Sequence, residues 1–486
     1  MGLSLALNSA RTSLAASAAQ IAVTARNTAG ANDPYYARRI ATVVTAGGGS
    51  AVNVLRAADA ALFGRKMLAT SEAAGSQAVL DGLQTLSQTI GDTDSTTSPA
   101  ARLGALNAAL QAAANKPDSV ELARNAVEAA RDLAGSLNTA AAAVQTVRQQ
   151  ADTAMATSVV RINDLLVSYE AANQTVTRGT AIGADVTDAL DDRDRILTQL
   201  SEEIGITTAV RAGNDVAIYT DSGVPLFERG ARKVTFEPTA AFSAGSTGKA
   251  VMIDGVPVTG VASPMPARSG RIVGLATLRD DVAVRYETQL DALAGGLVTA
   301  FAEPRTNGTG PAALMGLFTD GSAGVPARLP VAETGLAAKI RINAAVDPRM
   351  AGSALDTLRD GGMNGADYRS NTGAAAYADR LRGLVSALGA DRTFDAATGL
   401  RTSDSLLSFA TGSAGWLEGQ RKSAAFLADY ESTLLARTSD ALSNAVGVNT
   451  DDETARALEL ERSYTASAKL LTLVNDLLKT LMDAVR

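Results

Sequence analysis

The residues whose types and spacing could support catalysis are few. Asp191, Asp192 and Asp194 alternate with Arg193 and Arg195. Paired carboxylates can serve as acid and base in glycoside hydrolysis. However, neighbouring opposite charges usually neutralise each other on a solvated helix face, and aromatic residues, at 4% of the chain, offer little for stacking a sugar. We therefore expect this cluster to have a structural role.

Two other segments resemble ligand sites only superficially. Residues 243–250 resemble a phosphate-binding loop, but Ser243 replaces its first glycine and Ala250 replaces the hydroxyl residue that would hold magnesium. A loop between strands explains this segment better. Residues 451–453 are all acidic, but the central glycine of a calcium loop is absent. Thr450 and Glu453 have capping-box spacing instead, which predicts the start of a helix.

The composition excludes most common catalytic and metal sites. The chain of 486 residues contains no His and no Cys, so thiolate nucleophiles, zinc thiolates and imidazole bases are impossible. We expect no catalytic, metal-binding or cofactor-binding residue, and no enzymatic activity. The net charge of -7, with no strongly basic stretch, argues against nucleic acid as a partner.

Membrane insertion and ordinary secretion are not indicated either. The long uncharged stretch 40–55 contains several Thr, Gly and Ser residues instead of about 20 apolar ones. The first residues, 1–4, do not begin a basic region followed by an apolar one, so no signal peptide is predicted. We expect no membrane partner, and either retention inside the cell or export without cleavage.

The elements that position these residues begin with two amphipathic helices, one at each end. Residues 3–28 and 460–485 both carry a stripe whose spacing alternates between four and three, as in the seam of a coiled coil. Each stripe spans roughly 38 Å, so the two helices match in length. The predicted assembly interface consists of Leu3, Leu7, Leu14, Ile21, Leu460, Tyr464, Leu471, Val474, Leu478, Leu481 and Val485. The alternative is that both helices pack inside one globular domain.

The remainder predicts a mainly α fold with a β insertion. Residues 55–111, 118–176, 272–301, 374–388 and 406–445 are predicted to be helical. A polar loop at 93–99 interrupts the first stretch, and a capping box at Asp118 and Glu121 begins the second. Residues 206–270 alternate in polarity, and Asp254-Gly255 indicates a hairpin turn. Residues 304–365 are irregular and rich in Gly and Pro, with one strand at 339–342. This order suits an elongated rod whose two ends lie together.

Several ordered motifs resemble the flagellar axial proteins, and among them the hook-filament junction family. The resemblance rests on residues 27–38 (Asn27, Asn32, Pro34, Tyr36 and Arg38), 160–173 (Val160, Ile162, Asn163, Leu165 and Asn173), 188–201 (with the Asp-x-Arg-Asp cluster), 269–280 (Ser-Gly-Arg-Ile-Val-Gly-Leu, then Arg-Asp) and 447–469 (Gly447, Val448, Asn449, Asp452, Glu453, Tyr464 and 466–469). Tyr35 stands where the family usually has Gly. The chain also lacks the family's His after the helix near Phe301, and Arg462-Ser463 replaces its usual Gln.

The resemblance implies an organisation in three parts. Residues 1–40 with 448–486 would form a terminal coiled-coil domain at the inner wall of a tube. Residues 41–205 with 271–447 would form a helical rod, and residues 206–270 a small outward β domain. It also gives the Asp191 cluster a structural role.

The function implied is mechanical coupling of hook to filament in the bacterial flagellum. The implied partners are other copies of the chain in a ring or helical layer, the hook protein, the next hook-associated protein and an export chaperone. The family is exported unfolded by the flagellum's own type III apparatus, which implies an extracellular location without a cleaved signal peptide. Ordering of the terminal helices would then accompany assembly.

Two alternatives remain open on the sequence alone. Flagellin or another axial filament protein would share the terminal heptads but not the motifs at 191–194 and 270–280. A secreted carbohydrate-active enzyme would use carboxylates a few ångströms apart, and a sugar-hydrolysis screen would detect it.

Overall fold

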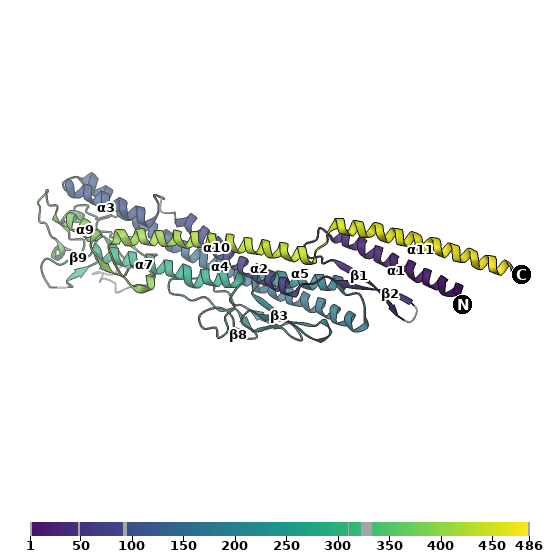
Figure 1. Ribbon diagram of the computed structural model, residues 1–486. Coiled ribbons are helices and arrows are strands. Elements are labelled where there is room, and N and C mark those ends of the chain that lie inside the picture. Colours follow the sequence, from purple (N-terminus) through teal and green to yellow (C-terminus); the bar gives the residue numbers. More distant parts are fainter. Residues whose placement is uncertain (1, 47–48, 91–94, 310, 322–332, 485–486) are drawn as a thin grey trace.

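The computed structural model describes residues 2–46, 49–90, 95–309, 311–321 and 333–484. The chain forms an elongated, mainly helical rod with a smaller β portion on its flank and both termini at one end (Figure 1). The mainly α fold with a β insertion, expected from the sequence, is confirmed.

Three long helices run lengthwise through the rod: α2 (Ala60–Ile90), α4 (Val120–Ile182) and α10 (Leu406–Val446). The 63 residues of α4 extend roughly 95 Å. Helix α10 packs along α2, and α4 packs against α2 and α3 (Pro99–Asn115). The core between them consists mainly of Leu, Ala and Val, and small Ala side chains allow the helices to approach closely. The apolar content of the sequence thus lies between long helices.

Local signals fix the ends of α4. Ser119, and not the predicted Asp118, caps its first turn, because the Ser119 hydroxyl accepts a hydrogen bond from the Leu122 amide at 3.4 Å. At the other end Gly183 adopts φ 69°, the left-handed conformation that suits glycine at a helix C-terminus. Helix α5 (Thr187–Glu203) follows and packs back on α4.

A β-hairpin precedes α2 where the sequence analysis expected no strand. Strands β1 (Arg39–Ala46) and β2 (Gly49–Arg56) pair antiparallel, with Arg39 opposite Arg56. The helix expected from Leu55 begins only at Ala60, after Asp59 accepts bonds from two amides of its first turn. Residues 39–56 contain several Thr and Val residues, which favour extended backbone. The helical pattern of the residues that follow hid this signal in the sequence.

The β portion consists of two three-stranded antiparallel sheets. The first contains β3 (Ile206–Val210), β4 (Val216–Thr220) and β5 (Pro225–Phe227), and the second contains β6 (Val234–Thr235), β7 (Met252–Ile253) and β8 (Val256–Pro257). The predicted hairpin turn is confirmed, because Asp254 and Gly255 have φ of 48° and 82°. Tyr169 of α4 donates to the Val216 carbonyl at 2.7 Å, so the first sheet is fastened to the rod.

After the β portion the chain returns as one helical segment, as expected. It comprises α6 (Arg271–Thr277), a π-helical turn (Leu278–Val282) and α7 (Ala283–Ala300). Arg279 lies in the π turn and is buried. Its guanidinium contacts Asp152 at 2.5 Å and Asp280 at 2.7 Å, and donates to the Lys249 carbonyl at 2.9 Å. One residue of the π turn therefore joins α4 to the loop that precedes β7.

Short elements fill the far end of the rod. They are β9 (Glu303–Pro304), β10 (Ala313–Leu314), β11 (Phe318–Thr319), β12 (Arg341–Ile342), α8 (Thr357–Asp360), α9 (Asp379–Gly389), β13 (Arg392–Thr393), β14 (Ser403–Asp404), and 3-10 turns at Ala212–Asn214 (in the β portion), Ala366–Tyr368 and Ala396–Thr398. Strand β12 lies within the predicted 339–342. Buried Glu303 accepts bonds from the amides of residues 362–364, which organises this glycine-rich segment.

Two helices extend beyond the rod: α1 (Gly2–Gly30) and α11 (Thr450–Ala484). They lie side by side and antiparallel, with the chain ends at their outer tips (Figure 1). Helix α11 begins at the predicted place, but Asn449 provides the cap: its side chain accepts from the Asp451 amide at 3.0 Å and from the Asp452 amide at 3.4 Å. The predicted cap, Thr450, is the first residue of the helix.

Candidate assembly site

The helix pair α1–α11 holds the residues predicted for the assembly interface. Across the pair, the Ser13 and Ser467 hydroxyl oxygens lie 3.2 Å apart. The buried apolar side chains of the pair are small or β-branched, among them Ala10, Ala16, Val23 and Val474. Such residues let the two backbones approach closely.

The predicted stripe residues differ in how far this pair covers them. Val474 is buried; Leu7, Leu14, Ile21, Leu460, Leu471 and Leu478 are half-buried; Tyr464 is exposed. The side chains of Leu3 and Leu481 are not described, and Val485 lies outside the described residues. The half-buried leucines keep part of their apolar surface available to a further partner.

A second apolar stripe on α11 was missed by the sequence analysis. Leu470, Leu473 and Leu477 are half or more exposed, as are Leu458 and Met482. Their spacing of three and four places the first three on one face. The sequence held this signal, but the heptad chosen at Leu460 assigned these positions to the polar side. The uncovered face is apolar surface that association would remove from water.

Asn27 fixes the turn between α1 and the hairpin. Its side-chain oxygen accepts from the Arg39 amide at 2.8 Å and from the Tyr36 hydroxyl at 2.9 Å, while its amide donates to the Arg39 carbonyl at 2.9 Å. The Arg38 amide donates to the Val446 carbonyl at 2.8 Å, so the start of the chain is tied to the end of α10. The motif of Asn27, Tyr36 and Arg38 therefore connects the terminal helices to the rod.

The acidic cluster of α5 forms the other half of this connection. Arg39 contacts Asp188 and Asp191, each at 2.7 Å, and Arg56 contacts Asp191 at 2.7 Å and Asp194 at 2.5 Å. Burial raises the pKa of Asp191, although both arginines oppose that shift. We call these five residues the junction clamp. It holds the base of the hairpin against the rod.

The remaining members of the cluster also have structural partners. Arg193 is buried and donates to the Asn214 carbonyl at 2.6 Å and to Asn173 at 3.2 Å. Asp192 pairs with Arg195 at 3.0 Å on the solvated side. The cluster thus joins α5 to the hairpin on one side and to the first β sheet on the other. Its charged side chains are therefore engaged in contacts that stabilise the fold.

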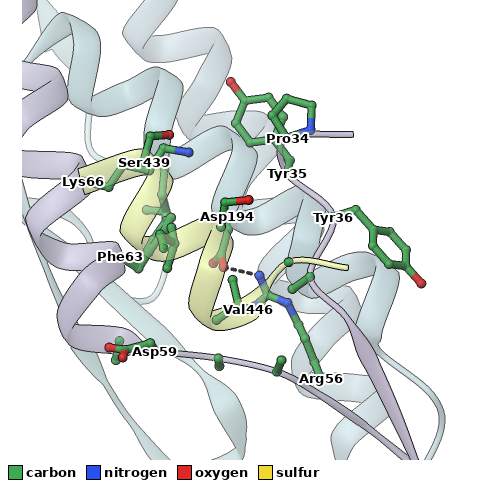
Figure 2. Close-up of a pocket in the computed structure, with 18 of the residues that line it drawn as sticks. Pro34, Tyr35, Tyr36, Arg56, Asp59, Phe63, Lys66, Asp194, Ser439 and Val446 are labelled. Carbon is green, nitrogen blue, oxygen red and sulfur yellow. Dashed lines mark hydrogen bonds and ion pairs between the residues drawn. The ribbon is translucent and has the colours of Figure 1, made fainter. Parts of the chain in front are cut away.

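Next to the clamp lies a hollow of about 460 Å³, which we call the junction hollow (Figure 2). Its walls come from the turn before β1, the start of α2, α5, the first β sheet and the end of α10. Phe63, Met67, Leu442 and Val446 contribute apolar surface, and Lys66 contributes an ammonium group. Burial lowers the pKa of Lys66. Asp33, Asp59, Asp194 and Asp440 also line the hollow, so it combines apolar walls with charges of both signs.

The other segments that resembled ligand sites are occupied by internal contacts. The carbonyls of Ser243 and Ser246 accept hydrogen bonds from Arg148 at 3.3 and 2.5 Å. This loop therefore presents carbonyl oxygens to a guanidinium, whereas a phosphate site would present backbone amides. Within the described ranges, no group of three or more acidic residues is arranged to hold a metal ion. In that same part of the chain no helix is long and apolar enough to cross a membrane.

Comparison with known proteins identifies two regions of similarity. Residues 83–316 match the family model described as the flagellar hook-associated protein FlgK helical domain, and residues 441–484 match that of the flagellar basal body rod FlgEFG protein C-terminal. These matches agree with the resemblance inferred from the motifs and favour hook-associated proteins over flagellin. No curated protein matches the chain.

A solved structure also resembles the chain: the flagellar hook junction protein FlgK from Burkholderia pseudomallei. The TM-score is 0.42 and the identity 20%, over 53% of this chain and 47% of that one. The chain thus matches about half the length of that protein.

Proposed function

As a member of the FlgK family of flagellar hook-associated proteins, this chain is a structural component of the flagellum, and we propose that it joins the hook to the filament. The observation that carries the proposal is the match of residues 83–316 to the FlgK helical domain. In this role the chain transmits torque and bending and catalyses no reaction.

Different parts of the chain have different roles in this proposal. The helix pair α1–α11 provides the surface that assembles, because its half-buried stripe and the exposed leucines of α11 leave apolar area uncovered. The junction clamp passes force from that pair to the rod through five charged side chains. The domain limits 1–40 with 448–486, 41–205 with 271–447, and 206–270 are part of this proposal.

The proposal also covers partners and location. The chain forms a ring or helical layer with its own copies, between the hook protein and the next hook-associated protein. It reaches this extracellular position by the flagellar type III route and meets an export chaperone beforehand. The absence of cysteine fits passage as an unfolded chain, since no disulfide has to form or break.

The test is to replace the chain in its own cells by the variants Leu471→Asp and Leu478→Asp. A charge at either half-buried position opposes burial in an assembled seam. We expect each variant to be secreted while hooks lack filaments in electron micrographs. Thr472→Asp, at an exposed position between them, is the matched control and should support filaments.

Two results would contradict the proposal at different levels. Normal filaments on cells that produce only Leu471→Asp or Leu478→Asp would disprove the assembly interface. Normal hooks with filaments in cells that lack the chain altogether would disprove the hook-filament function itself.

A further inference from the structure

Helix α10 carries an exposed aromatic patch that the fold does not use. Phe426 and Tyr430 are 74% and 55% exposed, and Asp429 lies beside them on the surface. Spacings of three and four place the three residues together on one face. We call them the α10 knob. Aromatic residues make up only 4% of the chain, and several, such as Phe301 and Phe409, lie in the core. Two adjacent exposed rings therefore indicate a contact surface.

The charge of the α10 knob comes from Asp429. Among the described residues, no hydrogen bond or ion pair engages the Asp429 carboxylate, although other acidic residues of α10, such as Glu418, pair with neighbouring cations. A carboxylate beside two exposed rings defines an anchor that is apolar and negatively charged. In the junction hollow, Lys66 offers a charge of the opposite sign beside apolar walls.

Inside the hollow, the Lys66 ammonium has no ion pair with any residue that the structure describes. It lies 5.4 Å from the centre of the Tyr35 ring, and Phe63 lies on the same helix one turn earlier (Figure 2). Four carboxylates line the hollow, and none of them pairs with Lys66. Asp194 pairs with Arg56 at 2.5 Å, and Asp59 accepts from the first amides of α2. Asp33 lies 3.9 Å from Arg195, and Asp440 is exposed. The hollow thus offers apolar walls and, in Lys66, an ammonium group that has no ion-pair partner among the described residues.

The knob cannot reach the hollow of its own chain. On α10 the hollow is lined by residues between Ser439 and Val446. From Phe426 to Val446 the helix advances roughly 30 Å and turns through about 200°, so the two features lie on different sides of the helix. A contact between them requires two molecules.

We propose that the junction hollow of one copy receives the α10 knob of a neighbouring copy, with Asp429 pairing with Lys66. This inference rests on the proposed function and specifies the neighbour within the layer. The two copies lie parallel and are displaced along the rod by roughly 20 to 30 Å. Because knob and hollow are different surfaces, the contact is head-to-tail and propagates into a ring or helix.

The first test is a charge exchange in the full chain, produced in cells that lack the original copy. Lys66→Glu and Asp429→Lys should each lower the fraction of hooks that carry filaments by at least about tenfold, because like charges would meet. The double variant should return that fraction to within about twofold of the original chain. Failure of the double variant to rescue, or normal filaments with either single variant, would overturn the proposal.

Controls separate this contact from misfolding and from the proposed function. Asp429→Lys should unfold at nearly the original temperature, because Asp429 is exposed and has no ion pair among the described residues. If Lys66→Glu fails to fold, Phe426→Ala with Tyr430→Ala tests the knob without touching the hollow, and intact filaments would then refute it. Filaments on cells that lack every copy of the chain would refute the proposed hook-filament function itself. The failures named above would refute only the contact between knob and hollow.

The second test uses the absence of cysteine. Arg65→Cys and Thr433→Cys lie on exposed positions beside Lys66 and the knob. In isolated hook-filament structures, a bismaleimide should link this pair into a ladder of dimers, trimers and larger products. Ala171→Cys with Thr433→Cys is the matched control and should give none. A ladder absent from structures that carry filaments, or one limited to dimers, would exclude the head-to-tail contact.

Discussion

Asp191 on α5 lies 2.7 Å from the Arg39 guanidinium at the start of the β1–β2 hairpin, and both side chains are buried. The same carboxylate lies 2.7 Å from Arg56 at the end of that hairpin. One acidic side chain thus holds both strands where the terminal helices meet the rod. The finding explains why aspartates alternate with arginines in this segment.

We predict that Asp191→Ala lowers the free energy of unfolding by about 3 to 5 kcal/mol, because it leaves buried Arg39 and half-buried Arg56 with fewer counter-charges. Asp188→Ala is the matched control. Asp188 also contacts Arg39 but its side chain is 81% exposed, so we expect a loss below about 1 kcal/mol. Urea denaturation of both variants measures the difference. Equal effects would mean that burial does not decide the strength of the clamp.

A pH dependence follows from Glu287, which is buried beside Arg148 and Gln145. Burial raises the pKa of Glu287 to about 7 from an ordinary value of 4.5, although Arg148 opposes this. The folded protein therefore binds the proton more tightly than the unfolded chain does. Protonated Glu287 therefore stabilises the folded state, fully below about pH 4.5, and this contribution is lost as the pH rises through about 7.

We expect the free energy of unfolding to fall between pH 5 and pH 7.5 by roughly 1 to 3 kcal/mol more in the original protein than in Glu287→Gln. The amide keeps the shape of the carboxyl group but does not titrate. Urea midpoints at the two pH values provide the measurement. A parallel decline in both proteins would assign the pH dependence to other groups.

The turn of the β7–β8 hairpin gives a third prediction. Gly255 has φ 82°, and a side chain added there would meet open space, so a substitution costs only backbone strain. We expect Gly255→Val to lower the free energy of unfolding by about 1 to 2 kcal/mol while filaments still assemble. Loss of assembly without loss of stability would show that this turn contacts a neighbour.

The matched control is Gly104, inside α3, where an added side chain also meets open space but no positive φ is required. Gly104→Ala should raise stability by about 0.5 to 1 kcal/mol, because alanine restricts the unfolded chain and favours helix. The melting temperatures should therefore move in opposite directions for the two positions.

Much of the fold followed from local patterns. The helices, the β portion and the Asp254-Gly255 turn are encoded within a few residues each, by periodicity, propensity and turn chemistry. Errors arose where two local signals competed. At 39–56 the β-branched residues favoured strands, but the neighbouring helical pattern was extended over part of them. At the starts of α4 and α11 the residue beside the predicted one provides the cap: Ser119 instead of Asp118, and Asn449 instead of Thr450.

The sequence by itself determined that this chain has no histidine or cysteine chemistry, that its ends are amphipathic helices, and that its motifs belong to a flagellar family. Only the tertiary structure decided what the charged cluster contacts and which apolar faces stay uncovered. Asp191 meets Arg39 because the chain turns back across the base of the hairpin, and Leu473 is exposed because α1 covers the opposite side of α11. Such pairings depend on long-range packing, which local spacing does not encode.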